Sequence, residues 1–132
     1  ARLAGARDGM ARLGLDGFAH AFAASRLMPA TDPSVVAAYA ADVRRTLPDG
    51  FLEALGSLVV QDFRDRLGAI RCPTLVLVGD HDAGTPPPMA ETLRDGIPGA
   101  ALTVIPDAGH FSVLDQPAVF DGLVKGFLDR HR

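Results

Sequence analysis

The chain has 132 residues, of which 48% are hydrophobic and 22% are charged, and its formal net charge is −3. This composition is typical of a folded globular domain, and a weakly acidic chain without a basic run does not favour nucleic-acid binding. No apolar run approaches the roughly 20 residues that cross a bilayer, and the start shows no signal-peptide pattern, so we expect no membrane association and a cytoplasmic location. The single cysteine, Cys72, excludes an internal disulfide, and no spacing of ligand residues predicts a metal site.

Residues 1–70 show only helical spacing of apolar side chains, and we interpret them as one all-helical region. A first amphipathic helix lies near residues 15–25, where Phe18 and Phe22 are four residues apart. A second helix begins at Asp32, a candidate N-cap that is followed by a proline. A third helix begins near Pro48, in the "TLPDG" stretch that we interpret as a loop. The apolar stripes of the second and third helices comprise Val36, Tyr39 or Ala40, Val43 and Leu47, and then Phe51, Leu52, Leu55, Leu58 and Val59.

The pattern changes at Cys72, where "CPTLVLVGD" is a short apolar run typical of a parallel strand that is buried on both faces. A helix follows, with Thr85 as its candidate cap. Its apolar residues Met89, Leu93 and Ile97 lie four apart. The run "ALTVI", residues 101–105, predicts a second strand. A final helix has a predicted inward face of Val119, Phe120, Leu123, Val124, Phe127 and Leu128. Region 71–132 therefore has the order strand, helix, strand, helix, which is typical of an α/β fold.

This order predicts where two polar side chains meet. Asp82 follows the first strand and His110 follows the second. Because adjacent parallel strands end at the same sheet edge, about 4.8 Å apart, we expect both side chains at that edge. A carboxylate beside an imidazole fixes its tautomer and makes it a general base. Asp80 and Asp107 are rival acids, although local turn bonding is their expected use. The alternative for the pair is a structural histidine and a turn aspartate.

The chain offers no convincing nucleophile for this base. None of Ser25, Ser34, Ser57 and Ser112 lies on the G-x-S-x-G turn between strand and helix that such a serine requires. Ser112 follows His110 too closely for in-line attack, and its expected bond is to local backbone. Cys72 lies at the opposite end of its strand, on the order of 20 Å from the edge where the acid emerges.

The stretches "GDHDAGTPP" and "PDAGHFSVLDQP" resemble the acid and histidine motifs of the α/β-hydrolase superfamily, and the sequence looks most like the later part of the 3-oxoadipate enol-lactonases. The matching positions are Gly79, Asp82, Pro86, Gly109, His110, Asp115, Gln116 and Pro117. The resemblance implies a partial α/β-hydrolase fold, in which an all-helical cap (residues 1–70) precedes the last two parallel strands and their helices (residues 71–132). It also implies that Asp82 is the triad acid and His110 the triad base, that no cofactor is needed, and that the nucleophile lies upstream of Ala1.

These observations predict the later part of a serine hydrolase that cleaves an ester or lactone of a small carboxylic acid, with the chain inactive alone. Because two strands make too small a sheet to be stable, we expect the missing N-terminal half as a partner and self-association of the isolated piece. Candidate pocket residues, which core packing explains equally well, are Phe18, Phe22, Met28, Phe51 and Phe111. The alternatives are a non-catalytic binding module and a carbon–carbon hydrolase or perhydrolase on the same scaffold.

Overall fold

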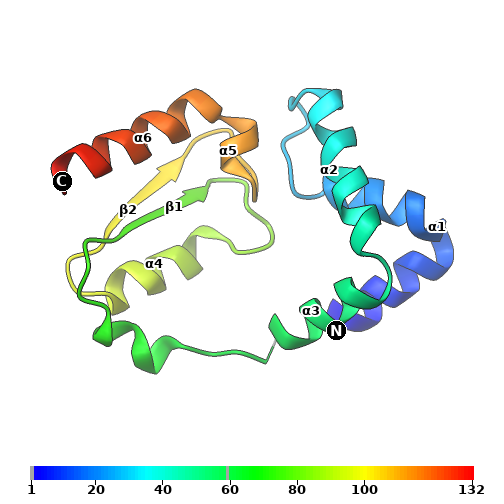
Figure 1. The fold of residues 1–132 in the computed structure, drawn as a ribbon, viewed down its shortest axis with the longest axis horizontal. Helices are drawn as coiled ribbons and strands as arrows, with labels where there is room; N and C mark the ends of the chain where they lie inside the picture. The colour runs from blue at the N-terminus through cyan, green and yellow to red at the C-terminus, as the bar shows by residue number, and fades with distance from the viewer. Residues whose placement is uncertain (1, 59) are drawn as a thin grey trace. The chain divides into compact units, whose positions relative to one another are not determined.

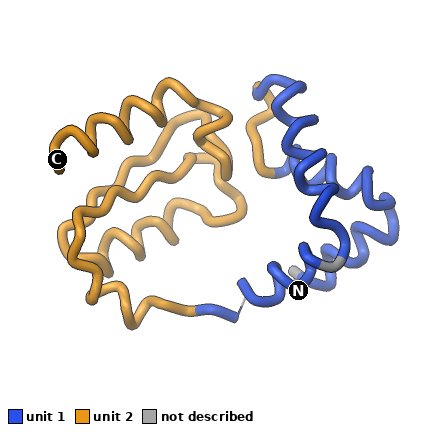
Figure 2. Tube along the Cα trace, viewed as in Figure 1, with its two compact units in different colours: residues 1–25, 31–61 blue, residues 26–30, 62–132 orange. Residues whose placement is uncertain are grey.

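A computed structural model describes residues 2–58 and 60–132 of the chain (Figure 1). The chain divides into a helical unit, residues 1–25 with 31–61, and a sheet unit, residues 26–30 with 62–132 (Figure 2). The segment Arg26–Ala30 therefore joins two helices of the helical unit but packs with the sheet unit. Val59, predicted on the apolar stripe of the third helix, lies outside the described residues.

The helical unit contains α1 (Arg2–Ala24), α2 (Pro33–Thr46) and α3 (Asp49–Leu58). Gly14 interrupts α1 with a φ of 68° and a ψ of 172°, a backbone conformation that glycine reaches at low cost. The helix expected near residues 15–25 is thus the second of two helices that meet at a kink at Gly14 within α1. Within the described part of the chain, no helix has the combination of length and hydropathy that a membrane span requires.

Helix α2 begins as its sequence predicts. The Asp32 carboxylate accepts a hydrogen bond from the main-chain N–H of Ser34 at 2.8 Å, and a proline opens the first turn. This cap satisfies one of the N–H groups that a helix start leaves without an intrahelical partner. Ala40 and Val43 are buried on the predicted face.

Three phenylalanines pack together in the helical unit. The ring centroids of Phe18 and Phe22 are 6.0 Å apart, those of Phe18 and Phe51 5.8 Å, and those of Phe22 and Phe51 5.1 Å. Both contacts of Phe51 are edge-to-face, a geometry that adds to the stabilisation from burial. Leu58, predicted on the same stripe as Phe51, is exposed at the last residue of α3, so this part of the prediction is wrong.

The sheet unit pairs two parallel strands, as expected. Its elements are the 3₁₀ helix η1 (Arg64–Ala69), β1 (Leu75–Gly79), α4 (Pro87–Gly96), β2 (Ala101–Ile105), α5 (Ser112–Asp115) and α6 (Pro117–Arg130). The pairing runs from Leu75 opposite Ala101 to Gly79 opposite Ile105, so both strands end at the same edge. Helix α4 packs against both strands, and α6 runs along their other side (Figure 1). This arrangement confirms the predicted α/β architecture.

The cover of this small sheet is incomplete within the described residues. Only Val78 and Gly79 of β1 are buried, and its first three residues are half-buried, so the prediction of a strand buried on both faces is wrong. Helix α6 has no buried residue, and Val119 and Leu128 of its predicted inward face are exposed. The physical reason is that two strands present too little apolar surface to bury a full helix face.

Helix α4 starts later than its sequence predicts. Its N-cap is Pro86 and makes no side-chain cap hydrogen bond, so the expectation that Thr85 caps this helix is wrong. Met89 is exposed and Ala90 is buried, which places the inward face of α4 one residue from the predicted position.

A glycine allows the two strand ends to meet. A Cβ atom added to Gly79, the last residue of β1, would lie 2.1 Å from the carbonyl oxygen of Ala108 and 2.3 Å from that of Gly109. Real Cβ atoms do not approach a carbonyl oxygen so closely, because this distance lies well inside van der Waals contact. The loop after β2 can therefore cross the end of β1 only where β1 carries no side chain.

We expect Gly79→Ala to lower the free energy of unfolding by about 1–3 kcal/mol, because the added methyl group overpacks a backbone contact. Gly122→Ala is the matched control, since nothing lies within 4 Å of its added Cβ on α6. Alanine there should raise stability by about 0.5–1 kcal/mol. Urea unfolding measures both, and a Gly79→Ala variant as stable as the parent would contradict the close approach.

Candidate active site

Asp82 lies in the turn that follows β1. Its main-chain N–H donates to the carbonyl of Gly79 at 3.2 Å, which turns the chain sharply at the strand end. The residue is only 6% exposed, an unusual degree of burial for an aspartate. A buried carboxylate needs hydrogen-bond donors around it, so its partners define the site.

Hydrogen bonds join this turn to the loop that carries His110. The main-chain N–H of Asp80 donates to Ile105 at 3.0 Å, and that of His81 donates to Ala108 at 2.9 Å. The Asp80 carboxylate in turn accepts from the N–H of Ala108 at 3.2 Å. Hydrogen bonds thus hold the turn after β1 against the end of β2 and the loop that follows it.

The structure brings Asp82 and His110 together at this edge. The imidazole Nδ1 lies 2.9 Å from the carboxylate Oδ2 of Asp82. Because a carboxylate only accepts, Nδ1 carries the hydrogen in this contact and Nε2 is left as the basic nitrogen. The His110 side chain is 32% exposed and that of Asp82 is 5% exposed, so the acid is enclosed while the ring remains accessible.

Three further hydrogen bonds hold the Asp82 carboxylate. Oδ1 accepts from the main-chain N–H groups of Gly84 at 2.7 Å and of Thr85 at 2.9 Å. The Thr85 hydroxyl donates to Oδ2 at 2.8 Å and lies 3.3 Å from Nδ1 of His110. The side chain expected to cap α4 therefore serves the acid instead.

These contacts keep Asp82 ionised. Burial by itself raises the pKa of its carboxyl, but the hydrogen bonds from Thr85, His110 and Gly84 together outweigh burial and leave the pKa below its ordinary value. A buried, ionised carboxylate stabilises an imidazolium beside it. The pair can therefore accept a proton at Nε2 of His110 and return it later, which is general acid–base chemistry.

The rival acids have other partners. The Asp80 carboxylate lies 2.7 Å from Nδ1 of His81, and this hydrogen bond is the main cause that lowers its pKa. Asp107 has a φ of 52°, and its main-chain carbonyl accepts from the Gln116 side chain at 3.2 Å. The Asp80 carboxylate thus bonds to His81 and to the histidine loop, and local turn bonding by the Asp107 side chain stays a prediction.

Among the described residues, no candidate nucleophile, whether serine or cysteine, hydrogen-bonds to the imidazole of His110. The Ser25 hydroxyl donates to the carbonyl of Phe22 at 2.7 Å, and Ser112 is buried at the start of α5. Cys72 is exposed and precedes β1, at the end of the strand opposite Asp82.

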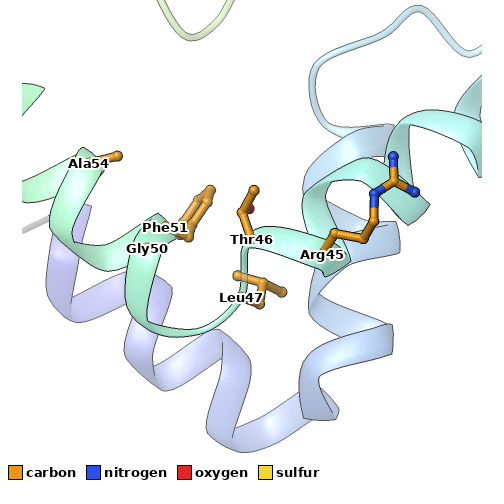
Figure 3. Close-up of a pocket in the computed structure, with 6 residues that line it drawn as sticks. All are labelled: Arg45, Thr46, Leu47, Gly50, Phe51 and Ala54. Carbon is orange, nitrogen blue, oxygen red and sulfur yellow. The ribbon is translucent and has the colours of Figure 1, made fainter.

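The five candidate pocket residues separate into different environments. Phe18 and Phe22 belong to the aromatic core, and Phe51 both packs there and lines an open pocket of about 560 Å³ where α2 passes into α3 (Figure 3). Met28 belongs to the segment Arg26–Ala30 of the sheet unit. Phe111 packs edge-on against His110, with ring centroids 5.1 Å apart. A pocket role for these side chains stays a prediction.

The sequence singles out two residues, Thr85 as a helix cap and Asp115 as a position of the histidine motif, but does not predict that they support the pair. Thr85 follows Asp82 by three positions, and an aspartate that accepts from the N–H groups two and three residues later is a recognisable local motif. Asp115 bonds to Gly109 and to Met28, and the latter is 87 positions away. No local pattern identifies a contact of that range.

The lowered pKa of Asp82 makes stability depend on pH, and Thr85 contributes to the effect. The pKa of this carboxyl is lower in the folded chain than in the unfolded chain, so its ionised form stabilises the fold above about pH 4. The stabilisation is lost as the pH falls through the folded pKa. Thr85→Val removes one hydrogen bond to Oδ2 and so raises the folded pKa of Asp82. We expect the variant to lose about 1–2 kcal/mol at pH 7 and less at pH 2.5.

Urea unfolding between pH 2.5 and 7 measures this difference. Thr85→Ser keeps the hydroxyl, so its unfolding free energy should vary with pH as that of the parent does. Asp82→Asn should lack the part of this variation that comes from the Asp82 carboxyl. Asp80 contributes equally to all these proteins. If Thr85→Val and Thr85→Ser give parallel curves over the whole range, the hydroxyl does not act on the carboxylate.

A protein family matches most of the chain. Residues 1–122 match the Alpha/beta hydrolase family. A curated relative, the 2-hydroxy-6-oxononadienedioate/2-hydroxy-6-oxononatrienedioate hydrolase of Klebsiella pneumoniae, is 36% identical over 89 residues, which are 66% of this chain and 31% of that protein.

Solved structures resemble nearly all of the chain. A thermophilic esterase from Thermogutta terrifontis is 31% identical with a TM-score of 0.79, and the match covers 98% of this chain and 51% of the esterase. The enol-lactonase from Burkholderia xenovorans is 27% identical with a TM-score of 0.75, covering 83% of this chain and 45% of that one. The chain thus spans about half the length of these structures and about a third of the curated relative. With its partial fold of two parallel strands and flanking helices, the chain belongs to the alpha/beta hydrolase family.

Proposed function

We propose that the chain supplies the acid and the base of a serine hydrolase that cleaves an ester or a lactone of a small carboxylic acid. Asp82 is the acid that orients the ring, and His110 is the base. The nucleophilic serine lies in a segment that precedes Ala1. The helical unit is the lid of the substrate site.

One observation carries the proposal, the 2.9 Å contact between Nδ1 of His110 and Oδ2 of Asp82. Two features distinguish it from an ordinary turn contact. The carboxylate is buried and accepts three further hydrogen bonds, and the ring that it orients is accessible. A histidine with a merely structural role has no need of an ionised, enclosed partner, because a backbone carbonyl would satisfy Nδ1 at a lower desolvation cost.

The chemistry follows from the basic nitrogen. Nε2 of His110 takes the proton of the serine hydroxyl as its oxygen attacks the substrate carbonyl, and Asp82 stabilises the imidazolium that forms. The imidazolium then gives the proton to the alcohol oxygen, whose bond to the carbonyl carbon breaks. An acyl-enzyme remains. The same ring then takes a proton from a water molecule as the water oxygen attacks the acyl carbon. The imidazolium returns this proton to the serine oxygen as its bond to the acyl carbon breaks, which releases the acid and the free serine.

The comparisons support the substrate class. The Thermogutta structure is described as an esterase and the Burkholderia structure as an enol-lactonase, and both names denote cleavage of a carbonyl–oxygen bond. An enol-lactonase-like activity is the finer form of the proposal. The Klebsiella relative favours one alternative, since its name gives a 6-oxo dicarboxylate as substrate, for which hydrolysis would break a carbon–carbon bond.

The apolar surface of the sheet unit supports a preceding segment as partner. Val104 on β2 is 43% exposed, and Met89 and Leu93 on α4 are exposed as well. A two-stranded sheet also leaves unpaired N–H and C=O groups along its edges, which a further strand would satisfy. Without such a partner, self-association of the chain would cover the same surface.

The direct test is hydrolysis by the polypeptide that includes the preceding segment, with the chain alone for comparison. We expect the longer polypeptide to cleave p-nitrophenyl acetate and a small enol-lactone, and the chain alone to be inactive. Asp82→Asn should lower kcat by about three to four orders of magnitude, because the ring then adopts the wrong tautomer. Initial rates with a chromogenic ester measure this effect.

Asp107→Asn is the matched control, because it makes the same change at a rival acid and asparagine tolerates a positive φ. It should retain the parent rate. Equal rates for Asp82→Asn and the parent would remove the assignment of the acid. A folded polypeptide that cleaves only a 6-oxo dicarboxylate would replace ester hydrolysis by carbon–carbon hydrolysis, and one that cleaves none of these substrates would leave a binding role.

A further inference from the structure

The geometry points to Asp115 as a positioning residue for His110. We infer that its carboxylate fixes the main chain of the histidine loop to the segment Arg26–Ala30 and thereby sets where the imidazole stands. The inference rests on the proposed function, in which His110 is the base. Asp115 contacts main-chain groups and acts through them.

The Asp115 carboxylate bridges two distant parts of the chain. Its Oδ2 accepts from the main-chain N–H of Gly109 at 2.7 Å, and its Oδ1 accepts from that of Met28 at 3.0 Å. Gly109 directly precedes the base, whereas Met28 lies 87 positions away. One side chain thus connects the loop that carries the base to the segment that joins α1 to α2. Figure 2 colours that segment, residues 26–30, with the sheet unit.

A third hydrogen bond fixes the base itself. The main-chain N–H of His110 donates to the carbonyl of Arg26 at 2.9 Å. The N–H groups of residues 109 and 110 therefore both bond into this cluster, and rotation of the loop about either residue would break at least one of these bonds. His110 is therefore held at two points. Its ring bonds to Asp82, and its main-chain N–H bonds to Arg26.

The packing around Gly109 leaves no room for a side chain. A Cβ atom on this glycine would lie 2.8 Å from the carbonyl oxygen of Arg26 and 3.2 Å from Oδ2 of Asp115. Asp115 is itself fixed, because it ends α5 and its N–H donates to the carbonyl of Phe111 at 3.1 Å. The hydrogen bond from Gly109 to Asp115 closes the loop between these residues. The bonds to Arg26 and Met28 attach this closed loop to the Arg26–Ala30 segment.

The site requires a carboxylate in particular. Both partners are N–H donors, so the side chain at position 115 must offer two acceptor oxygens. An asparagine has one acceptor and would turn its NH₂ group toward one of the two donors. Asp115→Asn therefore keeps the size of the side chain and breaks the bridge at one end.

A positioning role predicts a specific kinetic result. Displacing a general base by a fraction of an ångström lowers the rate of the chemical step more than it weakens substrate binding. In the longer polypeptide, Asp115→Asn should lower kcat about 10- to 100-fold and leave KM within about twofold. Asp115→Glu keeps two acceptor oxygens and should recover much of the loss. Asp121→Asn, at an exposed position on α6, is the matched control and should behave like the parent.

Amide hydrogen exchange of the same proteins tests the anchoring independently of activity. In Asp115→Asn, the amides of Met28, Gly109 and His110 should exchange at least about tenfold faster, while those of β1 keep the parent rate. If the parent polypeptide hydrolyses nothing, the proposed function fails and the exchange result still decides the anchoring. The inference is overturned if Asp115→Asn matches Asp121→Asn in both measurements. It is also overturned if Asp115→Asn and Asp115→Glu both lose protection throughout β1, because Asp115 then stabilises the whole unit.

Discussion

The parallel pairing of β1 with β2 is the constraint on which the candidate site depends. Because Gly79 lies opposite Ile105, both strands end at the same edge of the sheet, and the turns that follow them lie side by side there. Asp82 comes three residues after one strand end and His110 five residues after the other. A shift of the register by one residue would move every side chain of one strand to the other face and separate the loops. The bare end of β1 at Gly79 is part of the same constraint, since the histidine loop crosses there.

Burial and hydrogen bonding act in opposite directions on the acid. Enclosing Asp82 at 6% exposure favours its neutral form, and a neutral carboxyl could not stabilise an imidazolium. Donors from Gly84, Thr85 and His110 reverse this preference. Four hydrogen bonds keep the Asp82 carboxylate ionised, and the same four bonds fix the direction in which its Oδ2 points. His110 is positioned differently, through its main chain, by a hydrogen bond to Arg26 and by the Asp115 bridge at the preceding residue.

Local signals in the sequence predict the elements well and their surroundings poorly. The Asp32 cap, the two strands and their order follow from short-range patterns, and the pairing of Asp82 with His110 follows from that order. The exposure of Val119 and Leu128 does not follow, because periodicity predicts which face is apolar and not whether anything covers it. Thr85 was misplaced because a residue just before a helix can serve either the helix or the preceding turn. The Asp115 contact with Met28 joins positions 87 apart, and only the folded chain brings them together.

The tautomer of His110 tests the central claim most directly. A long-range ¹H–¹⁵N NMR spectrum, recorded where the imidazole is neutral and assigned by loss of its signals in His110→Gln, shows which ring nitrogen carries the hydrogen. A hydrogen bond to the Asp82 carboxylate predicts a protonated Nδ1 and a bare Nε2, the less common form of a free imidazole. A protonated Nε2 with a bare Nδ1 would contradict the arrangement, because the ring could then neither donate to Asp82 nor accept a proton at Nε2.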